Sequence, residues 1–226
     1  MNDRPVRRLV VRLLPAFVVR FQRGVRARLR RHFDSRRLRR EARAARSIRL
    51  IVGNGGLAAA PGWIPTDIEY LNLLRPDDWA RYFAPASVAA ILAEHVWEHL
   101  TPADGLTAAQ VCHRYLQPGG YLRVAVPDGF HPDPAYIESV KIGGTGAGAD
   151  DHKVLYTHET LSRLLIEAGF AIELLEYFDR DGVFHATDWN PADGMVHRSR
   201  RFDERNRDGQ LHYTSLLLDA RKKAGA

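Results

Sequence analysis

Residues 114–128 read RYLQPGGYLRVAVPD, and this stretch decides the fold. Thr101, followed by a proline and an acid in the first turn, predicts the start of a helix that runs up to the PGG turn. The apolar run Tyr121–Val126 then predicts a strand that ends before Pro127. A helix that leads through a tight turn into a strand is the repeating unit of a parallel α/β sheet.

The same alternation continues on both sides of this stretch. Further apolar runs at 48–52, 63–67, 87–93, 170–177 and 211–219 predict strands, with helical segments between most of them. The last two runs have no helix between them, so they are expected to pair antiparallel. The sequence therefore predicts an α/β fold with a doubly wound, mostly parallel sheet of the seven-stranded, Rossmann-like type and one antiparallel strand.

A glycine-rich turn follows the first apolar run. Ile48–Val52 ends abruptly at Gly53, Asn54, Gly55 and Gly56. Glycines permit positive φ angles and a close approach of the backbone to a ligand, and the amides of such turns bind anions. Because ligands of these sheets bind at the carboxyl ends of strands, the turn predicts a nucleotide-type site.

The corner at residues 94–100, EHVWEHL, contains His95-x-x-Glu98-His99, the spacing that inverzincin metallopeptidases place on a zinc-binding helix. Such a helix must keep both histidines on one face. The strand before the corner and the helix start after it leave room for only about one helical turn. We therefore expect no metal site here, with Glu94 and His95 facing a bound ligand and the other two side chains turned toward the supporting structure.

The composition is that of one globular domain with a basic extension. The chain has 226 residues, of which 45% are hydrophobic and 27% charged, enough for a full core. Its single cysteine, Cys112, excludes an internal disulfide and favours a reducing compartment such as the cytoplasm. Residues 1–46 hold 16 arginines against three acids, a formal charge of +13, whereas residues 47–226 carry −7.

The basic segment, residues 1–46, is predicted to form an amphipathic helical arm attached to a domain over residues 47–226. Between residues 6 and 21, apolar side chains recur at steps of three and four. Arginines interrupt every apolar run, so the arm is too polar to span a membrane. It either packs on the body of the protein or makes a peripheral contact with the inner face of an anionic membrane through residues 4–31. Nucleic acid is the less favoured partner.

Three segments together resemble class I S-adenosylmethionine-dependent methyltransferases, in particular the type-11 methyltransferase group. They are IVGNGG at 51–56, HVWEHL at 95–100 and the stretch at 114–128, and the resemblance covers about residues 48–219. The chain is most similar to bacterial members that carry a long loop with a DHK sequence and are associated with surface-polysaccharide assembly. The resemblance implies a cytoplasmic enzyme that transfers a methyl group from S-adenosylmethionine to a small polar acceptor, such as a carbohydrate hydroxyl.

The resemblance also implies a set of cofactor contacts. The glycine turn would meet the methionine carboxylate, and Glu94 would lie near the sulfonium. A carboxylate after the second strand would accept hydrogen bonds from the ribose hydroxyls, and Asp67 is the candidate. Only 14 residues separate Gly53 from Asp67, against roughly 20 in a dinucleotide fingerprint. The first helix is therefore shortened or lost, which leaves the ribose contact open.

Transfer to a hydroxyl group requires a base, and histidine suits this role near neutral pH. His95 is the first candidate, with Asp128 and His152 as alternatives. His152 belongs to a long segment, residues 129–156, that is either a closing lid or a plain flexible loop.

A second long segment, the insertion at residues 178–210, lies between the last two strands. It either forms part of the acceptor site or is a salt-bridged surface excursion. Its candidate substrate-binding residues are Trp189, Arg198, Arg200 and Arg201, because arginines hold phosphates or carboxylates well. Two other functions stay open: a binding module with this fold that does not turn over, and an RNA methyltransferase tethered by the arm. Zinc hydrolysis is the least favoured.

Overall fold

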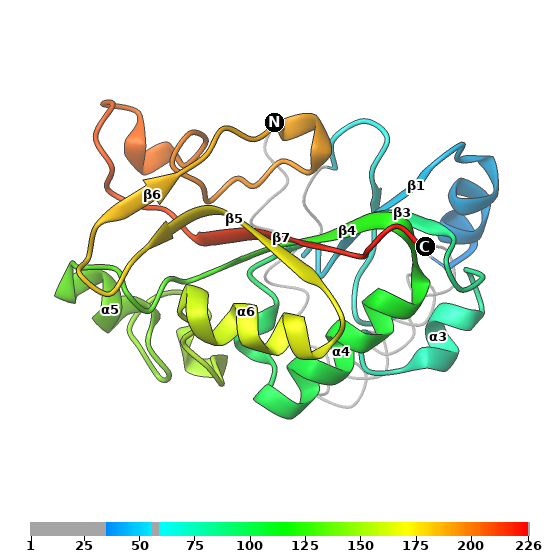
Figure 1. Ribbon diagram of the computed structural model, residues 1–226, viewed down its shortest axis with the longest axis horizontal. Coiled ribbons are helices and arrows are strands. Elements are labelled where there is room, and N and C mark those ends of the chain that lie inside the picture. The colour runs from blue at the N-terminus through cyan, green and yellow to red at the C-terminus, as the bar shows by residue number, and fades with distance from the viewer. Residues whose placement is uncertain (1–34, 56–58, 226) are drawn as a thin grey trace, which may run out of the picture.

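The computed structural model describes residues 35–55 and 59–225, and this part of the chain forms a seven-stranded mixed sheet. The strand order is β2-β1-β3-β4-β7-β5-β6 (Figure 1). The strands are β1 (Ile48–Val52), β2 (Ile64–Pro65), β3 (Val88–Glu94), β4 (Leu116–Val126), β5 (Ala171–Phe178), β6 (Phe184–Ala186) and β7 (Leu216–Arg221).

Strand direction agrees with the sequence-based prediction. β1, β2, β3 and β4 are mutually parallel, and β7 runs antiparallel to both of its neighbours, β4 and β5. The mostly parallel sheet with an antiparallel last strand is therefore confirmed. The structure adds a second, short antiparallel strand, because β6 forms within the 178–210 insertion and pairs with β5.

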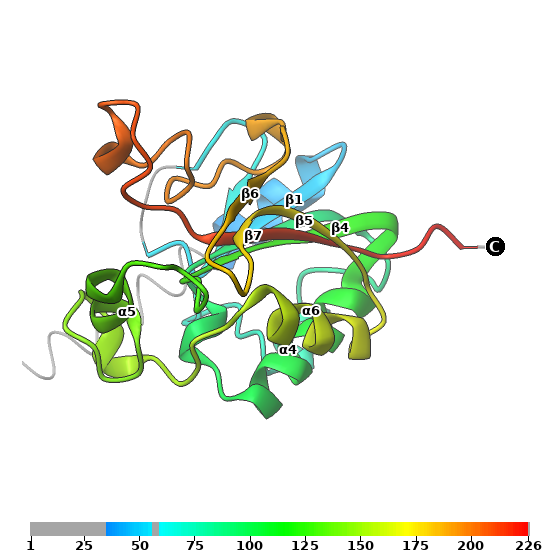
Figure 2. The same cartoon turned by 60° about the vertical axis from the view of Figure 1, so that its left-hand side comes forward.

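The two faces of the sheet are covered differently. Helices α4 (Pro102–Tyr115) and α6 (His158–Glu167) lie along one face, and α3 (Pro76–Ala80) lies on the same side (Figures 1 and 2). α5 (Pro134–Val140) lies at one end of the molecule. Doubly wound sheets usually carry helices on both faces. Here the chain between β6 and β7, in which only short 3-10 turns are described, takes the place of helices on the second face.

Helix α4 begins where its sequence signals predict. Thr101 Oγ1 accepts a hydrogen bond from the Asp104 amide at 3.2 Å, and Pro102 occupies the first helical position. The helix passes directly into β4, which begins at Leu116 rather than at Tyr121. The PGG turn is therefore part of the strand, and the pairing with β3 shifts register there. This irregularity is the reason that the sequence pattern placed the strand start too late.

Two apolar layers hold the sheet in place. The larger lies between the sheet and the helices and contains fully buried rings of Trp79, Trp97 and Tyr115. The smaller lies on the other face, where Trp63 and Trp189 pack against the strands. Burial of apolar area at roughly 25 cal/mol per Å² makes these layers the main source of stability. They fix the ends of β1 and β3, where the candidate site forms.

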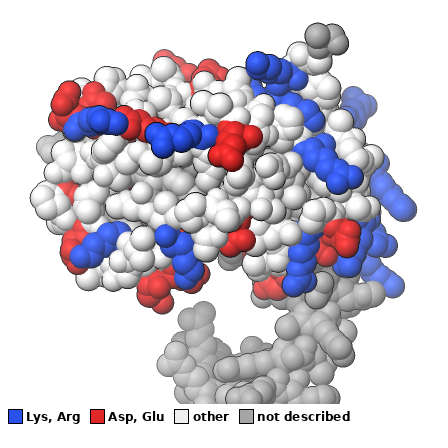
Figure 3. Space-filling view, turned by 60° about the horizontal axis from the view of Figure 1, so that its bottom comes forward, with Lys and Arg blue, Asp and Glu red and all other residues white. Residues whose placement is uncertain are grey.

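Residues 35–44 lie in a helix that packs on the body of the protein. Leu38 and Ala42, one turn apart, are buried in the larger core. The opposite side of the helix exposes Arg36, Arg39, Arg40 and Arg43. Figure 3 shows basic side chains gathered at one end of the molecule, whereas both signs of charge alternate over the rest of that view.

Two sequence-based predictions concern residues that the structure does not describe. The membrane contact through residues 4–31 and the cofactor contact of Gly56 both lie outside the described residues. Within residues 35–55 and 59–225, none of the helices has the length and apolar character needed to cross a bilayer.

Candidate functional site

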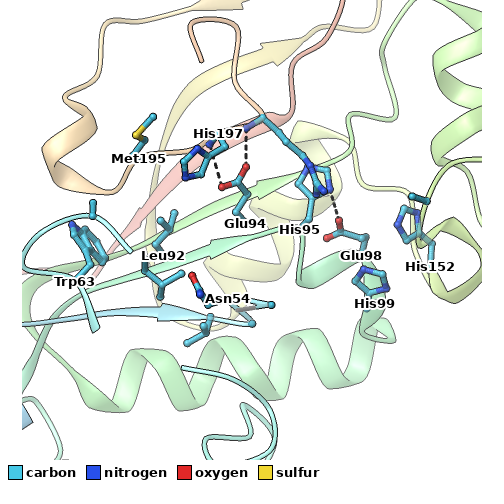
Figure 4. A pocket seen from close by; sticks show the side chains of 17 residues that line it. Asn54, Trp63, Leu92, Glu94, His95, Glu98, His99, His152, Met195 and His197 are labelled. Atoms are coloured by element: carbon cyan, nitrogen blue, oxygen red, sulfur yellow. Dashed lines mark hydrogen bonds and ion pairs between the residues drawn. The ribbon is translucent and has the colours of Figure 1, made fainter. Parts of the chain in front are cut away.

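A cavity of about 410 Å³ opens at the carboxyl ends of β1 and β3, where ligands of parallel α/β sheets bind. Its two ends differ in chemistry. Trp63 and Leu92 lie at one end, and Glu98, His99 and His152 lie at the other, with Glu94 and His95 between them (Figure 4). The cavity therefore pairs an apolar surface with a cluster of groups that can exchange protons or bind cations.

The glycine turn after β1 lines this cavity as predicted, through Gly53, Asn54 and Gly55. Gly53 and Gly55 have φ angles of 62° and 59°, which favour glycine. A Cβ at Gly53 would lie 2.7 Å from Val96 Cγ2, so a side chain has no room there. Glycine at this position therefore lets the turn pack closely against Val96.

The amides of Asn54 and Gly55 are bonded within the protein, and the predicted contact of the turn with the methionine carboxylate stays a prediction. The Asn54 amide donates to the Thr66 carbonyl at 3.0 Å, and the Gly55 amide donates to Asp67 Oδ2 at 3.2 Å. Asp67 Oδ1 accepts from the Ile68 amide at 2.8 Å. Asp67 does not line the cavity. This carboxylate holds the glycine turn in shape, and its contact with a ribose stays a prediction.

Glu94 ends β3 and lines the cavity, as predicted. Its Oε2 accepts a hydrogen bond from the His197 amide at 3.1 Å, and its Oε1 accepts from the Arg198 amide at 2.7 Å. The carboxylate thus holds a segment of the 178–210 insertion beside the cavity. Each carboxylate oxygen can accept a further hydrogen bond, so a ligand can still use this group.

His95 follows β3 in an uncommon backbone conformation, with a φ angle of 54°. Its amide donates to the Ala125 carbonyl at 2.8 Å, which fixes the corner against β4. The ring is held at both nitrogens: Nδ1 lies 2.9 Å from Glu98 Oε1, and Nε2 lies 3.0 Å from Ser215 Oγ. Figure 4 shows His95 directed toward Glu98 within the cavity lining.

Glu98 and His99 line the cavity, whereas the sequence pattern predicted that they turn toward the supporting structure. The corner contains a 3-10 helix, Trp97–His99, rather than a continuous α-helix, so His95 and His99 do not share a helical face. His152, predicted as an alternative base, lines the same end. Burial, and then the charge of Glu98, raise the pKa of nearby Tyr156 to about 12, so this phenol is protonated at neutral pH.

Asp128 is not part of the cavity lining, which argues against its predicted catalytic role. The side chain is fully buried, and burial raises its pKa. Oδ1 accepts from the Phe130 amide at 2.9 Å, and Oδ2 accepts from the Phe178 amide at 2.8 Å. Asp128 therefore connects the end of β4 to the end of β5.

The insertion contributes to the cavity through residues other than most of those predicted. Of the four candidates only Arg198 lines it. Trp189 is buried and donates from Nε1 to Glu176 Oε1 at 2.8 Å. Arg201 donates to the Trp189 carbonyl at 2.9 Å and lies over its ring, and the Arg200 amide bonds to Glu176. The contacts of Trp189, Arg201 and the Arg200 amide thus anchor the insertion to β5, and the predicted substrate contacts of these residues stay predictions.

Sequence reasoning missed the contributions of Trp63, Met195 and His197 to the cavity. Trp63 was assigned only to a strand, and its position beside the glycine turn follows from the short connection between β1 and β2. Met195 and His197 lie next to Arg198 in the insertion. The hydrogen bonds of Glu94 bring that segment to the site, and no local pattern encodes them.

No family model matches the chain, and no curated protein matches it. Solved structures with a similar arrangement include a SAM-dependent methyltransferase from Archaeoglobus fulgidus, with 18% identity and a TM-score of 0.44 over 85% of this chain and 94% of that one.

Two further similar structures have low identity as well. A SAM-dependent methyltransferase from Thermotoga maritima has 15% identity and a TM-score of 0.47, over 90% of this chain and 98% of that one. A S-adenosylmethionine dependent methyltransferase from Mesorhizobium loti has 14% identity and a TM-score of 0.46, over 81% of this chain and 95% of that one.

Proposed function

We propose that the chain is a methyltransferase that uses S-adenosylmethionine and acts on a small polar acceptor. The observation that supports this most directly is the glycine turn after β1, which opens onto a cavity of about 410 Å³ with an apolar and a polar end. Small-molecule sites typically enclose roughly 300–1,000 Å³ and combine apolar walls with a few polar groups.

The lining fits the chemical parts of this cofactor. Trp63 and Leu92 offer apolar surface to an adenine ring. Gly55, where nothing lies within 4 Å of the position of a Cβ, leaves space beside the backbone for the ribose or the methionine chain. Glu94 offers carboxylate oxygens to the cofactor's ammonium group. These residues come from β1, β3 and the segments that follow them, so the rigid sheet sets their spacing.

When bound, S-adenosylmethionine would supply a methyl group on its sulfonium: an acceptor oxygen would form a bond to the methyl carbon in line as the carbon–sulfur bond breaks, with S-adenosylhomocysteine as the leaving group. The chain must hold the acceptor oxygen and remove its proton. We assign the base to His95, because this residue lines the cavity and its Nε2 already lies within hydrogen-bond distance of a hydroxyl oxygen. An acceptor hydroxyl would replace Ser215 Oγ as the partner of Nε2.

The polar end of the cavity supports our choice of acceptor class. Its groups are two carboxylates and several imidazoles, with Arg198 at the rim. Groups of this kind recognise hydroxyl-rich molecules through charge-assisted hydrogen bonds. A carbohydrate hydroxyl is accordingly the acceptor that we propose, in agreement with the resemblance drawn from the sequence.

Calorimetry with S-adenosylhomocysteine tests the cofactor assignment. We expect binding in the micromolar range to the full chain, and a loss of at least tenfold in Gly55→Leu, whose side chain would enter the site. Gly209→Leu is the matched control: both glycines have positive φ and free space around a Cβ, but Gly209 lies away from the cavity. Equal affinity in the two variants, or no binding at high micromolar concentration, would overturn the proposal.

A binding module without turnover is the alternative that the same preparation can detect. It would bind S-adenosylhomocysteine, lose affinity in Gly55→Leu and methylate none of a panel of mono- and oligosaccharides. Methyl transfer to a sugar, measured with radiolabelled cofactor, would exclude it.

We also propose that the enzyme works in the cytoplasm, in peripheral contact with the inner face of an anionic membrane. The exposed arginines of the helix at residues 35–44 support this, because they continue the basic character of the preceding arm. RNA is the competing polyanion, and salt-dependent RNA binding would favour it.

A further inference from the structure

Glu98, His99 and His152 converge at the polar end of the cavity (Figure 4). We propose that these three side chains form a binding site for a divalent transition-metal ion. One nitrogen of each ring and one oxygen of Glu98 all lie within 4.8 Å of one another. The set differs from the His95-x-x-Glu98-His99 pattern in the sequence. The ring of His95 contacts Glu98 and Ser215 and is not part of the set, whose third member is His152 from a distant loop.

The backbone holds the two parts of the cluster together. Glu98 and His99 belong to the 3-10 helix at Trp97–His99. The amides of Lys153 and Val154 donate to the Glu98 carbonyl at 2.7 and 3.3 Å. The loop that carries His152 is therefore fixed to the corner, although about fifty residues separate the two in the sequence. Ligands on a fixed backbone require little ordering when an ion binds.

Glu98 has the features of a metal ligand. The residue is fully buried, and neither carboxylate oxygen has a hydrogen-bond partner among the described residues. Oε1 lies 2.9 Å from His95 Nδ1, but this contact does not have good hydrogen-bond geometry. Oε2 has no hydrogen-bond partner among the described residues. A buried carboxylate is costly unless it is paired, hydrogen-bonded or bound to a metal. A cation beside Oε2 would satisfy it.

His152 is oriented as metal-ligating histidines usually are. Its Nδ1 lies 2.7 Å from the Val140 carbonyl, which can only accept, so Nδ1 carries the hydrogen. The neutral ring then has its lone pair on Nε2. A backbone carbonyl bonded to the second ring nitrogen is a frequent support for such ligands, because it fixes both the tautomer and the ring orientation.

His99 completes the set. Its Nδ1 is buried without a hydrogen-bond partner among the described residues and lies 3.5 Å from Asp151 Oδ2. The rings of His99 and His152 meet edge to face, with centroids 4.9 Å apart. Two such rings beside a carboxylate, with the cavity open in front, give three ligands and a free coordination position.

The ligand types define the class of ion. Two imidazoles and one carboxylate suit Zn²⁺, Fe²⁺ or Co²⁺, whereas Mg²⁺ and Ca²⁺ prefer oxygen ligands. Around tetrahedral zinc, with bonds of about 2.0–2.1 Å, donor atoms lie roughly 3.3 Å apart. Small side-chain rotations that bring the donor atoms about 1.5 Å or less closer to one another would reach this distance. If the proposed function holds, the free position faces the acceptor, and the ion would make an acceptor hydroxyl more acidic.

Zinc binding by the full chain tests the site independently of methyl transfer. The protein is stripped with a chelator, dialysed and titrated with Zn²⁺ by calorimetry, and Co²⁺ is followed by visible absorption. We expect one ion per chain with submicromolar affinity, and an absorption pattern of few-coordinate Co²⁺. His99→Ala and His152→Ala should each weaken binding at least tenfold. His212→Ala is the matched control, because this exposed histidine also contacts a carboxylate, Asp208, away from the site.

Folding is checked by circular dichroism without metal. Should His152→Ala unfold, His99→Ala still decides, since that ring is one-third exposed. No stoichiometric binding, or equal affinity in His99→Ala and His212→Ala, overturns the metal site. Calorimetry with S-adenosylhomocysteine in chelator is run in parallel: cofactor binding without zinc binding removes the metal site alone, and zinc binding without cofactor binding removes the proposed function alone.

Discussion

His95 combines an uncommon backbone conformation with side-chain contacts at both ring nitrogens. Its φ angle of 54° belongs to the left-handed region, which β-branched and bulky residues rarely adopt. Backbone strain of this kind costs on the order of 1–3 kcal/mol and clusters at functional sites. Here it turns the ring from the end of β3 toward Glu98 and the cavity, and both nitrogens find partners. An ordinary strand end would direct the side chain elsewhere.

His95→Asn separates catalysis from folding at this position. Asparagine tolerates positive φ, so the corner should keep its shape while the base is lost. We expect kcat for methyl transfer to fall about 100-fold or more, the usual contribution of a positioned base. Affinity for S-adenosylhomocysteine, measured by calorimetry, should stay within about twofold. A parallel loss of cofactor affinity would instead assign His95 to cofactor binding.

His131 provides a pH-dependent element of stability. It stacks on Tyr136 with ring centroids 3.9 Å apart and lies 4.6 Å from Phe178. Burial lowers its pKa, and Asp133 opposes this only in part. The unfolded chain therefore takes up the proton first as the pH falls below about 6.5, and the folded state loses stability.

We expect the wild-type free energy of unfolding to fall between pH 7 and pH 5 in urea titrations. His131→Gln keeps a hydrogen-bond acceptor but cannot titrate, so the decrease should be smaller in this variant. An unchanged pH dependence would mean that other histidines dominate it.

At the scale of elements, buried charges attach the insertion to the sheet. Arg123 on β4 forms a two-bond ion pair with Asp219 on β7, at 2.7 and 3.0 Å. The same guanidinium donates to the Gly194 carbonyl at 2.8 Å. On β5, Glu176 accepts hydrogen bonds from the Trp189 side chain and the Arg200 amide. These contacts hold an irregular segment firmly enough to form one wall of a cavity.

Arg123→Ala should lower the free energy of unfolding by about 3 kcal/mol, because it leaves the buried Asp219 with only its longer contact to Arg221 at 3.3 Å. Arg180→Ala is the control. Its ion pair with Glu159 has the same bidentate form, but Arg180 is largely exposed, so the loss should be much smaller. Chemical denaturation measures both. Similar losses in the two variants would mean that Arg123 contributes no more than a surface charge.

Elements with local signals were predictable from the sequence, and contacts across long distances were not. Thr101 and Pro102 predict the start of α4, because a helix start is encoded by neighbouring residues. The glycine turn was recognised for the same reason. Trp189 is held by Glu176 on β5, and Arg201 is held by Trp189, contacts that no local pattern in the sequence marks. His152 was suspected, but its approach to Glu98 depends on amides that the sequence does not mark.

At the scale of the whole molecule, charge is divided between the N-terminal segment and the body. Residues 1–46 carry +13 and residues 47–226 carry −7. The helix at residues 35–44 connects the two regions. Leu38 and Ala42 bury one side of it against the core, so its arginines face outward on a fixed support. A basic surface that is held in place can add its attraction for a polyanion to that of the preceding arm.

Vesicle co-sedimentation tests this surface. The full chain should bind vesicles containing anionic lipid, and high salt should release it. Substituting Arg36, Arg40 and Arg43 by glutamine should weaken binding roughly 100-fold, since each basic residue near an anionic surface contributes about 1 kcal/mol. The control variant replaces Lys141, Arg180 and Arg207, which lose the same charge but are paired with acids on the body. If both variants weaken binding equally, only net charge matters. If RNA competes the chain off vesicles at physiological salt, nucleic acid becomes the favoured partner.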